Sequence, residues 1–171
     1  MWKFLLFIAA VVAWSDSAQA DNVYLTTLGG WDFFKVPAVG AMTNSNVIAT
    51  CGRAGMAYPC WWSRYSCNYD WDQGCIKFDD GGHCDTLIAL SVSLCGHEQA
   101  WYCQPLFDTF VYYPNLSWPY HDDSAGGLDY ENVQSVDHGQ NVLHGSHYFN
   151  KYALCAAKVG SHNGGTDVFT G

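Results

Sequence analysis

The sequence predicts an α+β fold, a disulfide-stapled single domain with two short helices and an antiparallel sheet. Three features of the 171 residues predict it: two short stretches with helical spacing of apolar residues, β-branched and aromatic runs near both ends, and eight cysteines. Helices set between strands, without a regular βαβ alternation, favour the α+β class. The helices are few and the connections long, which favours antiparallel pairing.

Residues 1–20 are typical of a secretory signal. Lys3 supplies a positive charge, an apolar run follows from Phe4 to Trp14, and small residues precede the expected cleavage after Ala20. The run is too short for a membrane-spanning helix. We therefore expect a secreted, extracellular protein without membrane insertion, with a cysteine-rich domain over 21–158 and a flexible tail over 159–171.

Two strands are predicted at the start of the domain. Asn22–Thr27 and Trp31–Val36 are rich in β-branched and aromatic residues, and Gly29-Gly30 between them is a turn signal. Pro37 is expected to end the second strand.

Capping residues and apolar spacing predict two helices. The first runs from about Ser45 to Ala54, with Thr43 or Ser45 as its N-cap and Gly55 as its stop. The second follows Asp85 and stops at Gly96, and it carries three leucines on one face: Leu87, Leu90 and Leu94.

Further strands are predicted at Cys75–Phe78, Phe107–Tyr113 and Tyr148–Ala157. Phe107–Tyr113 has the strongest strand composition, since it is mostly β-branched and aromatic. Met56–Gly74 lacks a period and is interpreted as a cross-linked loop. Tyr120–Gln140 is polar and is interpreted as an exposed loop.

The balance of charge argues against two classes of partner. Seven Lys and Arg residues stand against sixteen Asp and Glu residues, which gives an acidic chain of net charge −9. Phosphate backbones and anionic membranes repel such a chain, and no basic patch offsets the repulsion. Nucleic acid is therefore not an expected partner.

The cysteines are expected to form four disulfides, because an even number of them accompanies a secretory signal. No close pair of the kind found in zinc sites occurs. Cys51 lies on the apolar face of the first helix and Cys155 among small residues of the last strand, so a Cys51–Cys155 bond is predicted. Spacing leaves the other pairings open among the remaining residues: Cys60, Cys67, Cys75, Cys84, Cys95 and Cys103.

An aromatic cluster is the candidate ligand-binding site. It consists of Trp61, Trp62, Tyr65 and Trp71. Aromatic faces pack against the apolar faces of sugar rings, while the polar tips of Trp and Tyr form hydrogen bonds. The alternative is that these rings fill the core. Two adjacent residues of an extended segment face opposite sides, which keeps one of Trp61 and Trp62 available for binding.

No metal, cofactor or catalytic residue is predicted. His144 and His147, beside Asp137 or Asp122, have metal-ligating side chains, but no HExxH pattern occurs and scattered surface histidines explain them. Calcium ligands are available in an acidic stretch that lacks the EF-hand pattern and is otherwise a solvated loop: Asp122, Asp123, Asp129 and Glu131. No GxSxG motif or distinct carboxylate pair marks a hydrolase site.

One sequon is present, at Asn115-Leu116-Ser117, where an exposed turn after Pro114 would accept a glycan. Several short motifs near the cysteines are spread over residues 33–157: Met42–Val47 before Cys51, Ala54-Gly55-Met56, Tyr58-Pro59-Cys60, Leu94-Cys95-Gly96, Tyr102–Leu106, Phe110-Val111-Tyr112 and Tyr152–Cys155. They resemble a cysteine-rich extracellular domain of secreted proteins from invertebrate chordates and other marine animals. That resemblance supports the domain limits and the disulfides and implies no site residues.

The order of elements is similar, more loosely, to C-type-lectin-like domains. Their calcium and sugar signature is missing, because Gln104-Pro105-Leu106 lacks the acidic residue. The sequence therefore predicts a secreted recognition domain that binds a glycan or glycoprotein without catalysis. The alternatives are a small secreted hydrolase using late histidines and aspartates, and a matrix or assembly protein. A hydrolase requires a cleft where a histidine and a carboxylate converge.

Overall fold

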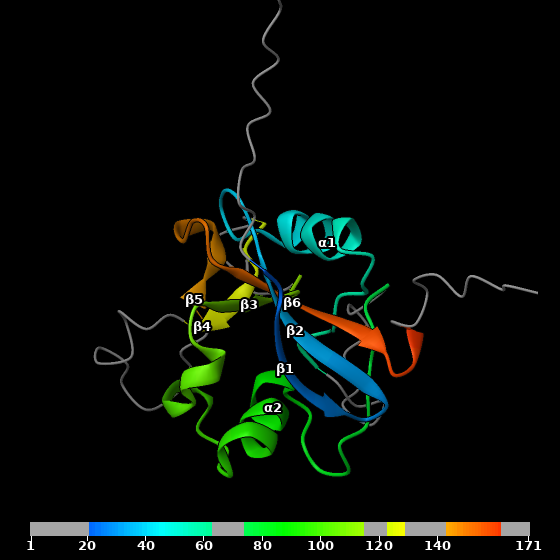
Figure 1. The fold of residues 1–171 in the computed structure, drawn as a ribbon. Helices are drawn as coiled ribbons and strands as arrows, with labels where there is room; N and C mark the ends of the chain where they lie inside the picture. The colour runs from blue at the N-terminus through cyan, green and yellow to red at the C-terminus, as the bar shows by residue number, and fades with distance from the viewer. Residues whose placement is uncertain (1–20, 63–73, 115–122, 129–142, 162–171) are drawn as a thin grey trace, which may run out of the picture.

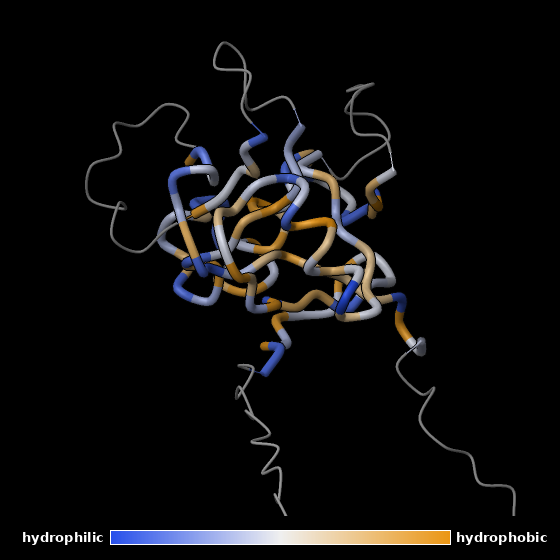
Figure 2. Tube along the Cα trace, turned by 90° about the horizontal axis from the view of Figure 1, so that it is seen from above, coloured by the Kyte–Doolittle hydropathy of each residue, from blue (hydrophilic) through white to orange (hydrophobic). Residues whose placement is uncertain are grey.

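The computed structural model describes residues 21–62, 74–114, 123–128 and 143–161 (Figure 1). The predicted signal and residues 162–171 of the predicted tail lie outside this part of the chain. The described residues form one α+β domain, in which α1 and α2 lie on opposite sides of a sheet (Figure 1). Hydrophobic segments gather between these layers, while hydrophilic ones lie at the periphery (Figure 2).

A six-stranded sheet forms the middle layer, in the order β1-β2-β6-β3-β4-β5. The bounds in chain order are β1 Val23–Leu28, β2 Trp31–Pro37, β3 Thr109–Val111, β4 Gly126–Leu128, β5 Leu143–His144 and β6 Tyr152–Lys158. The sheet is mixed, because β3 pairs in parallel with β6, whereas the other pairings are antiparallel as expected. Parallel pairing arises because β6 returns between β2 and β3 after the long excursion through β4 and β5.

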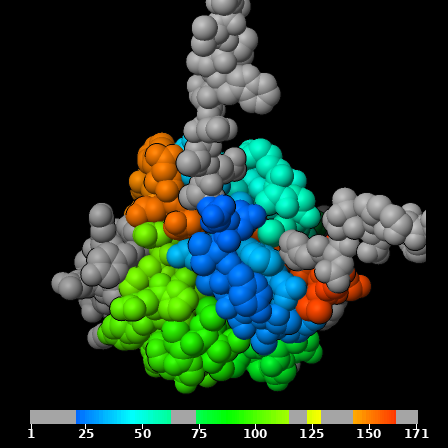
Figure 3. Space-filling view, in the orientation of Figure 1, coloured from blue at the N-terminus to red at the C-terminus, as the bar shows by residue number. Residues whose placement is uncertain are grey.

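The first two strands form the predicted hairpin. Leu28 pairs with Trp31, and the two glycines between them have φ values of 56° and 80°. Two successive residues of positive φ make a type I′ turn, which fits the twist of a hairpin and which glycine adopts without strain. On the outer surface, β1 is visible between α1 and α2 (Figure 3).

Both predicted helices are present and are capped as expected. α1 spans Asn44–Arg53, and its N-cap Thr43 accepts a hydrogen bond from the Asn46 N–H. α2 spans Thr86–Cys95 between its N-cap Asp85 and the left-handed Gly96. Short 3-10 helices follow at Ala100–Tyr102, Gln104–Leu106 and Gly145–His147.

The sheet separates two hydrophobic clusters because successive strand residues point to opposite faces. Phe33 and Leu154 face α2, and Val36 and Ala153 face α1. The α2 side also holds Leu87, Leu90, Leu106 and Val111, and the α1 side holds Met42, Val47, Cys51 and Phe110.

Three disulfides connect the described residues: Cys51–Cys155, Cys60–Cys75 and Cys95–Cys103. The prediction of Cys51–Cys155 is confirmed, and this bond joins α1 to β6. Cys84 is also disulfide-bonded, and no described cysteine is free. Cys67 lies outside the described residues.

Several local expectations were wrong. The strand predicted at Cys75–Phe78 is absent: this segment pairs at a single residue, in an isolated bridge between Ile76 and Pro59. Tyr120–Gln140 was expected to be exposed, yet it contains β4, whose residues are buried. The strand expected over Phe107–Tyr113 is limited to β3, since Asp108 before it takes a positive φ of 61°.

Among the described residues, no helix combines the length and the hydrophobicity that crossing a membrane requires.

Candidate functional site

The aromatic cluster is divided by the structure. Trp61 is 5 % exposed, and its ring stacks on Tyr113 at a centroid distance of 4.7 Å. Its backbone is fixed as well, because its N–H donates to the Tyr112 carbonyl and its carbonyl accepts from the Thr86 N–H. Trp61 is therefore a core residue, the alternative that the sequence left open. Trp62 is half-buried and packs against the same cluster, and Tyr65 and Trp71 lie outside the described residues.

The late histidines lie near one another at the β5 edge of the sheet. The rings of His144 and His147 are 6.5 Å apart between centroids. Within the described part of the chain, no three His, Cys, Asp or Glu side chains are grouped as metal ligands. The acids proposed beside them, Asp122 and Asp137, lie outside it.

Asp123 is the one member of the predicted calcium set that the structure describes. Its Oδ2 accepts hydrogen bonds from the Ser45 N–H at 3.1 Å and the Ser45 hydroxyl at 2.5 Å. A carboxylate at this position stabilises the N-terminal end of α1 through the helix dipole. Asp129, Glu131 and the sequon residue Asn115 lie outside the described residues.

Asp80, His83 and Glu98 form a carboxylate–imidazole–carboxylate arrangement. His83 Nδ1 lies 2.7 Å from Asp80 Oδ2, and His83 Nε2 lies 3.4 Å from Glu98 Oε1. Hydrogen bonding to Asp80 raises the pKa of His83, and the nearby charge of Asp80 adds to this effect. Burial opposes ionisation of Asp80, but hydrogen bonds from the Gly82 and His83 N–H groups and from the His83 ring hold its pKa below the usual value.

Only part of this arrangement was visible in the sequence. Asp79-Asp80-Gly81-Gly82 predicts a turn in which aspartate side chains accept backbone N–H bonds, and Asp80 Oδ1 does accept them from Gly82 and His83. The contact with Glu98 depends on where α2 ends. No sequence pattern relates the turn around Asp80 to the residues that follow α2, so the His83–Glu98 contact could not be predicted.

Asp85 carries a strongly shifted carboxyl group. Its Oδ1 accepts hydrogen bonds from the Leu87 and Ile88 N–H groups, at 2.8 and 3.0 Å. Burial nevertheless raises the pKa of Asp85 to about 7, against the effect of these two donors. The group caps α2.

Two of the few cations lie beside one carboxylate. Lys151 Nζ is 2.9 Å from Asp108 Oδ1, and Lys35 Nζ donates to the Phe107 carbonyl and lies 4.6 Å from the centre of the Tyr152 ring. Burial lowers the pKa of Lys35, although the charge of Asp108 opposes the change. These contacts satisfy both lysines and fasten β2 and β6 to the segment before β3.

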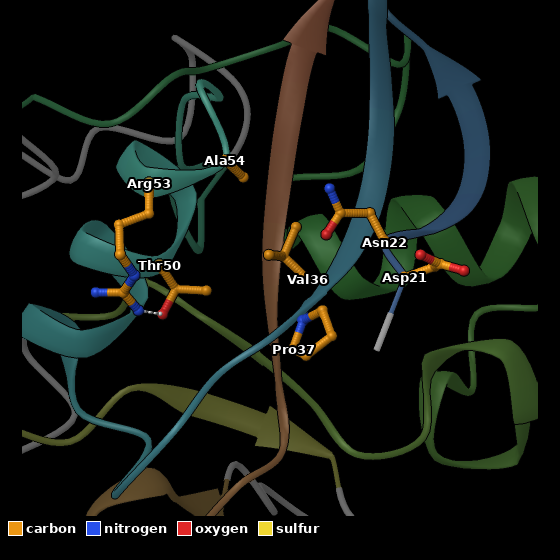
Figure 4. Close-up of a pocket in the computed structure, with 7 residues that line it drawn as sticks. All are labelled: Asp21, Asn22, Val36, Pro37, Thr50, Arg53 and Ala54. Carbon is orange, nitrogen blue, oxygen red and sulfur yellow. Dashed lines mark hydrogen bonds between the residues drawn. The ribbon is translucent and has the colours of Figure 1, made fainter. Parts of the chain in front are cut away.

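A groove lies between α1 and the first two strands, with a volume of about 250 Å³. One wall comes from the last turns of α1, and the other from the end of β2 and the residues before β1 (Figure 4). Its lining residues are Asp21, Asn22, Val36, Pro37, Thr50, Arg53 and Ala54. The groove therefore combines an apolar surface with amide, hydroxyl and guanidinium groups. The groove was not predictable from sequence patterns, because its walls are far apart in the chain.

No protein-family model, curated protein or solved structure matches this chain. The resemblances to a cysteine-rich extracellular domain and to C-type-lectin-like domains thus remain predictions.

Proposed function

We propose that this protein is an extracellular recognition domain that binds carbohydrate, free or on a glycoprotein, in the groove between α1 and the strands β1 and β2. The observation that supports this proposal is the set of residues that line the groove. Ligand sites in proteins are concave and contain a few polar groups that orient the ligand. Here Asn22 and Arg53 supply hydrogen-bond donors, and the partly exposed Pro37 and Ala54 supply apolar contacts.

This proposal moves the expected site away from the tryptophans. Trp61 offers almost no face to solvent, so a sugar ring cannot stack on it without opening the core. The groove residues Asn22 and Arg53 are exposed; Arg53 belongs to α1, and Asn22 directly precedes β1. Side chains on regular elements keep their positions better than side chains on loops.

The three disulfides support an extracellular setting, because such bonds persist in oxidising compartments. The same setting agrees with the signal predicted over residues 1–20. Secretion is part of the proposal.

A glycan array probed with the oxidised protein tests the function. Asn22→Trp places a large ring in the groove at an exposed position, and Val39→Trp adds the same ring at a residue that is 83 % exposed and outside the groove. We expect the wild type and Val39→Trp to bind the same glycans, and Asn22→Trp to lose them. Equal binding by all three proteins, or no binding by the wild type, contradicts the proposal.

A hydrolase is the second candidate, now based on His83 in place of the late histidines. Asp80 fixes the His83 ring through Nδ1, as a general base requires. Hydrolysis of ester, peptide or glycoside substrates by the wild type, and its loss in His83→Gln, would favour this candidate. Equal turnover by both proteins, or none, excludes it.

A further inference from the structure

Arg53 has no acidic partner among the described residues, a property that it shares with Lys77 and Lys158. No carboxylate oxygen lies within ion-pair distance of its guanidinium in the described part of the chain, whereas Lys151 contacts Asp108. A cation in the last turn of a helix stabilises the helix dipole. That effect explains a basic residue at this position but not the missing carboxylate.

A chain of hydrogen bonds along α1 orients the Arg53 side chain. Arg53 Nη2 donates to Thr50 Oγ1 at 2.9 Å, and Thr50 Oγ1 donates to Asn46 Oδ1 at 3.3 Å. Asn46 is itself fixed, because its Nδ2 donates to the Ala41 and Val39 carbonyls at 2.8 and 3.1 Å. Thr50 is 2 % exposed, so the anchor of this chain lies in the protein interior.

The remaining donors of Arg53 are open to a ligand. A guanidinium has five N–H donors in a planar fork, and Thr50 uses one of them. The fork matches a carboxylate, which accepts two parallel hydrogen bonds from it. In Figure 4 the guanidinium lies beside Thr50 at the α1 wall, while the Asp21 carboxylate points away from it.

The opposite side of the groove fits a sugar ring. Pro37 is the partly exposed apolar residue on this side, above the buried Val36, and the Asn22 amide is directed toward them (Figure 4). The volume of about 250 Å³ is below the roughly 300–1,000 Å³ common for drug-sized ligands, so the groove suits one monosaccharide unit.

We propose that the groove selects a carboxylated sugar, such as a uronic acid unit of a glycan, whose carboxylate is bound by Arg53 and whose ring lies on Pro37. This inference rests on the proposed carbohydrate-binding function and names the class of ligand.

Isothermal titration of the protein beginning at Asp21 tests this inference with three probes: D-glucuronate, D-glucose and N-acetylalanine. Glucose lacks the carboxylate, and N-acetylalanine carries a carboxylate without a sugar ring. We expect glucuronate to bind at least about tenfold more tightly than either, as one charge-assisted bidentate contact allows. Equal affinity for glucose overturns the role of the carboxylate, and equal affinity for N-acetylalanine overturns the role of the sugar.

Variants at Arg53 test whether this residue binds the carboxylate of the ligand. Arg53→Gln should remove the preference for glucuronate over glucose, and Arg53→Lys should retain part of it, because the charge remains without the fork. Both variants should remain folded, with Arg53→Lys near the wild-type unfolding temperature and Arg53→Gln slightly below it, since the residue is exposed but its charge favours the helix dipole. An unchanged preference in Arg53→Gln overturns the inference.

Asn22→Trp separates this inference from the function on which it rests. If it abolishes binding of both sugars while the wild type binds them equally, carbohydrate binding stands and the choice of a carboxylated sugar is wrong. If it leaves the binding of both sugars unchanged, the groove is not the site and both proposals fail.

Discussion

At the scale of single residues, Asp85 combines two opposed effects. Its carboxyl accepts the first free N–H groups of α2, which favours the charged form, but burial favours the neutral form and dominates. The folded state therefore holds a proton that the unfolded chain releases near pH 4.

The Asp85→Asn variant measures how much stability the protein loses when the buried Asp85 carboxyl ionises. Between about pH 4 and the folded pKa of about 7, the folded state binds more protons, so the wild-type free energy of unfolding falls as pH rises. Asparagine caps helices as well as aspartate and does not ionise. We expect the variant to be more stable than the wild type by roughly 1–2 kcal/mol at pH 8. This is less than the full pKa shift implies, because Asp85 is only half-buried as a residue. At pH 4 the two proteins should have nearly equal free energies of unfolding. Thermal unfolding across this range is the measurement, and a less stable variant at pH 8 contradicts the assignment.

Trp61 permits a second test at this scale. Trp61→Ala removes a core ring that stacks on Tyr113, and such truncations cost about 3–5 kcal/mol. Tyr102→Ala is the matched control, because Tyr102 is 60 % exposed, and it should change stability by less than about 0.5 kcal/mol. Denaturant titration measures both. Equal stability of Trp61→Ala and the wild type would restore the surface interpretation of the tryptophan.

At the scale of elements, the helices and the first hairpin could be predicted because local rules determine them. Thr43 and Asp85 mark the helix starts, and Gly29-Gly30 makes the turn. β4 and β5 could not be predicted, since strands of three and two residues have no readable period. Gly126-Gly127 resembled a loop signal, yet Gly127 is needed because the Phe110 ring covers it.

Two Gly→Ala substitutions distinguish these roles. A Cβ at Gly127 would lie 2.3 Å from the Phe110 ring, so Gly127→Ala should destabilise the fold by about 1–3 kcal/mol or more. A Cβ at Gly52 within α1 meets no atom within 4 Å, so Gly52→Ala should stabilise it by about 0.5–1 kcal/mol. Chemical denaturation of the two variants provides the comparison. The same sign of change in both would be inconsistent with this packing of β4 on β3.

At the scale of the whole molecule, the fold class and one disulfide could be predicted, but the site could not. Cys51 and Cys155 were paired correctly because each lies on the buried face of its own element, and these faces meet across the α1 side of the sheet. Cys95 ends α2, but its partner Cys103 and most of the other cysteines lie in segments without a period, where no face can be assigned. Asn22 and Arg53 line the same groove only because the fold brings their segments together, and neither residue belongs to a recognisable sequence motif.

Disulfide mapping tests the covalent framework of the molecule. Three bonds are placed, Cys84 is bonded, and Cys67 is the cysteine that remains, so we expect a Cys67–Cys84 bond. Peptide mapping by mass spectrometry under non-reducing conditions should recover this pair. Recovery of Cys67 as a free thiol, or of Cys84 linked to another cysteine, would contradict the framework.

The central claim is that the groove between α1, β1 and β2 is the ligand site, and a chemical-shift titration tests it most directly. The ¹⁵N-labelled protein would be titrated separately with D-glucuronate and D-glucose. The account predicts that amide shifts change near Asn22, Val36 and Thr50–Ala54, with larger changes for glucuronate near Arg53. Changes confined to another surface, or none with either sugar at millimolar concentration, would contradict the claim.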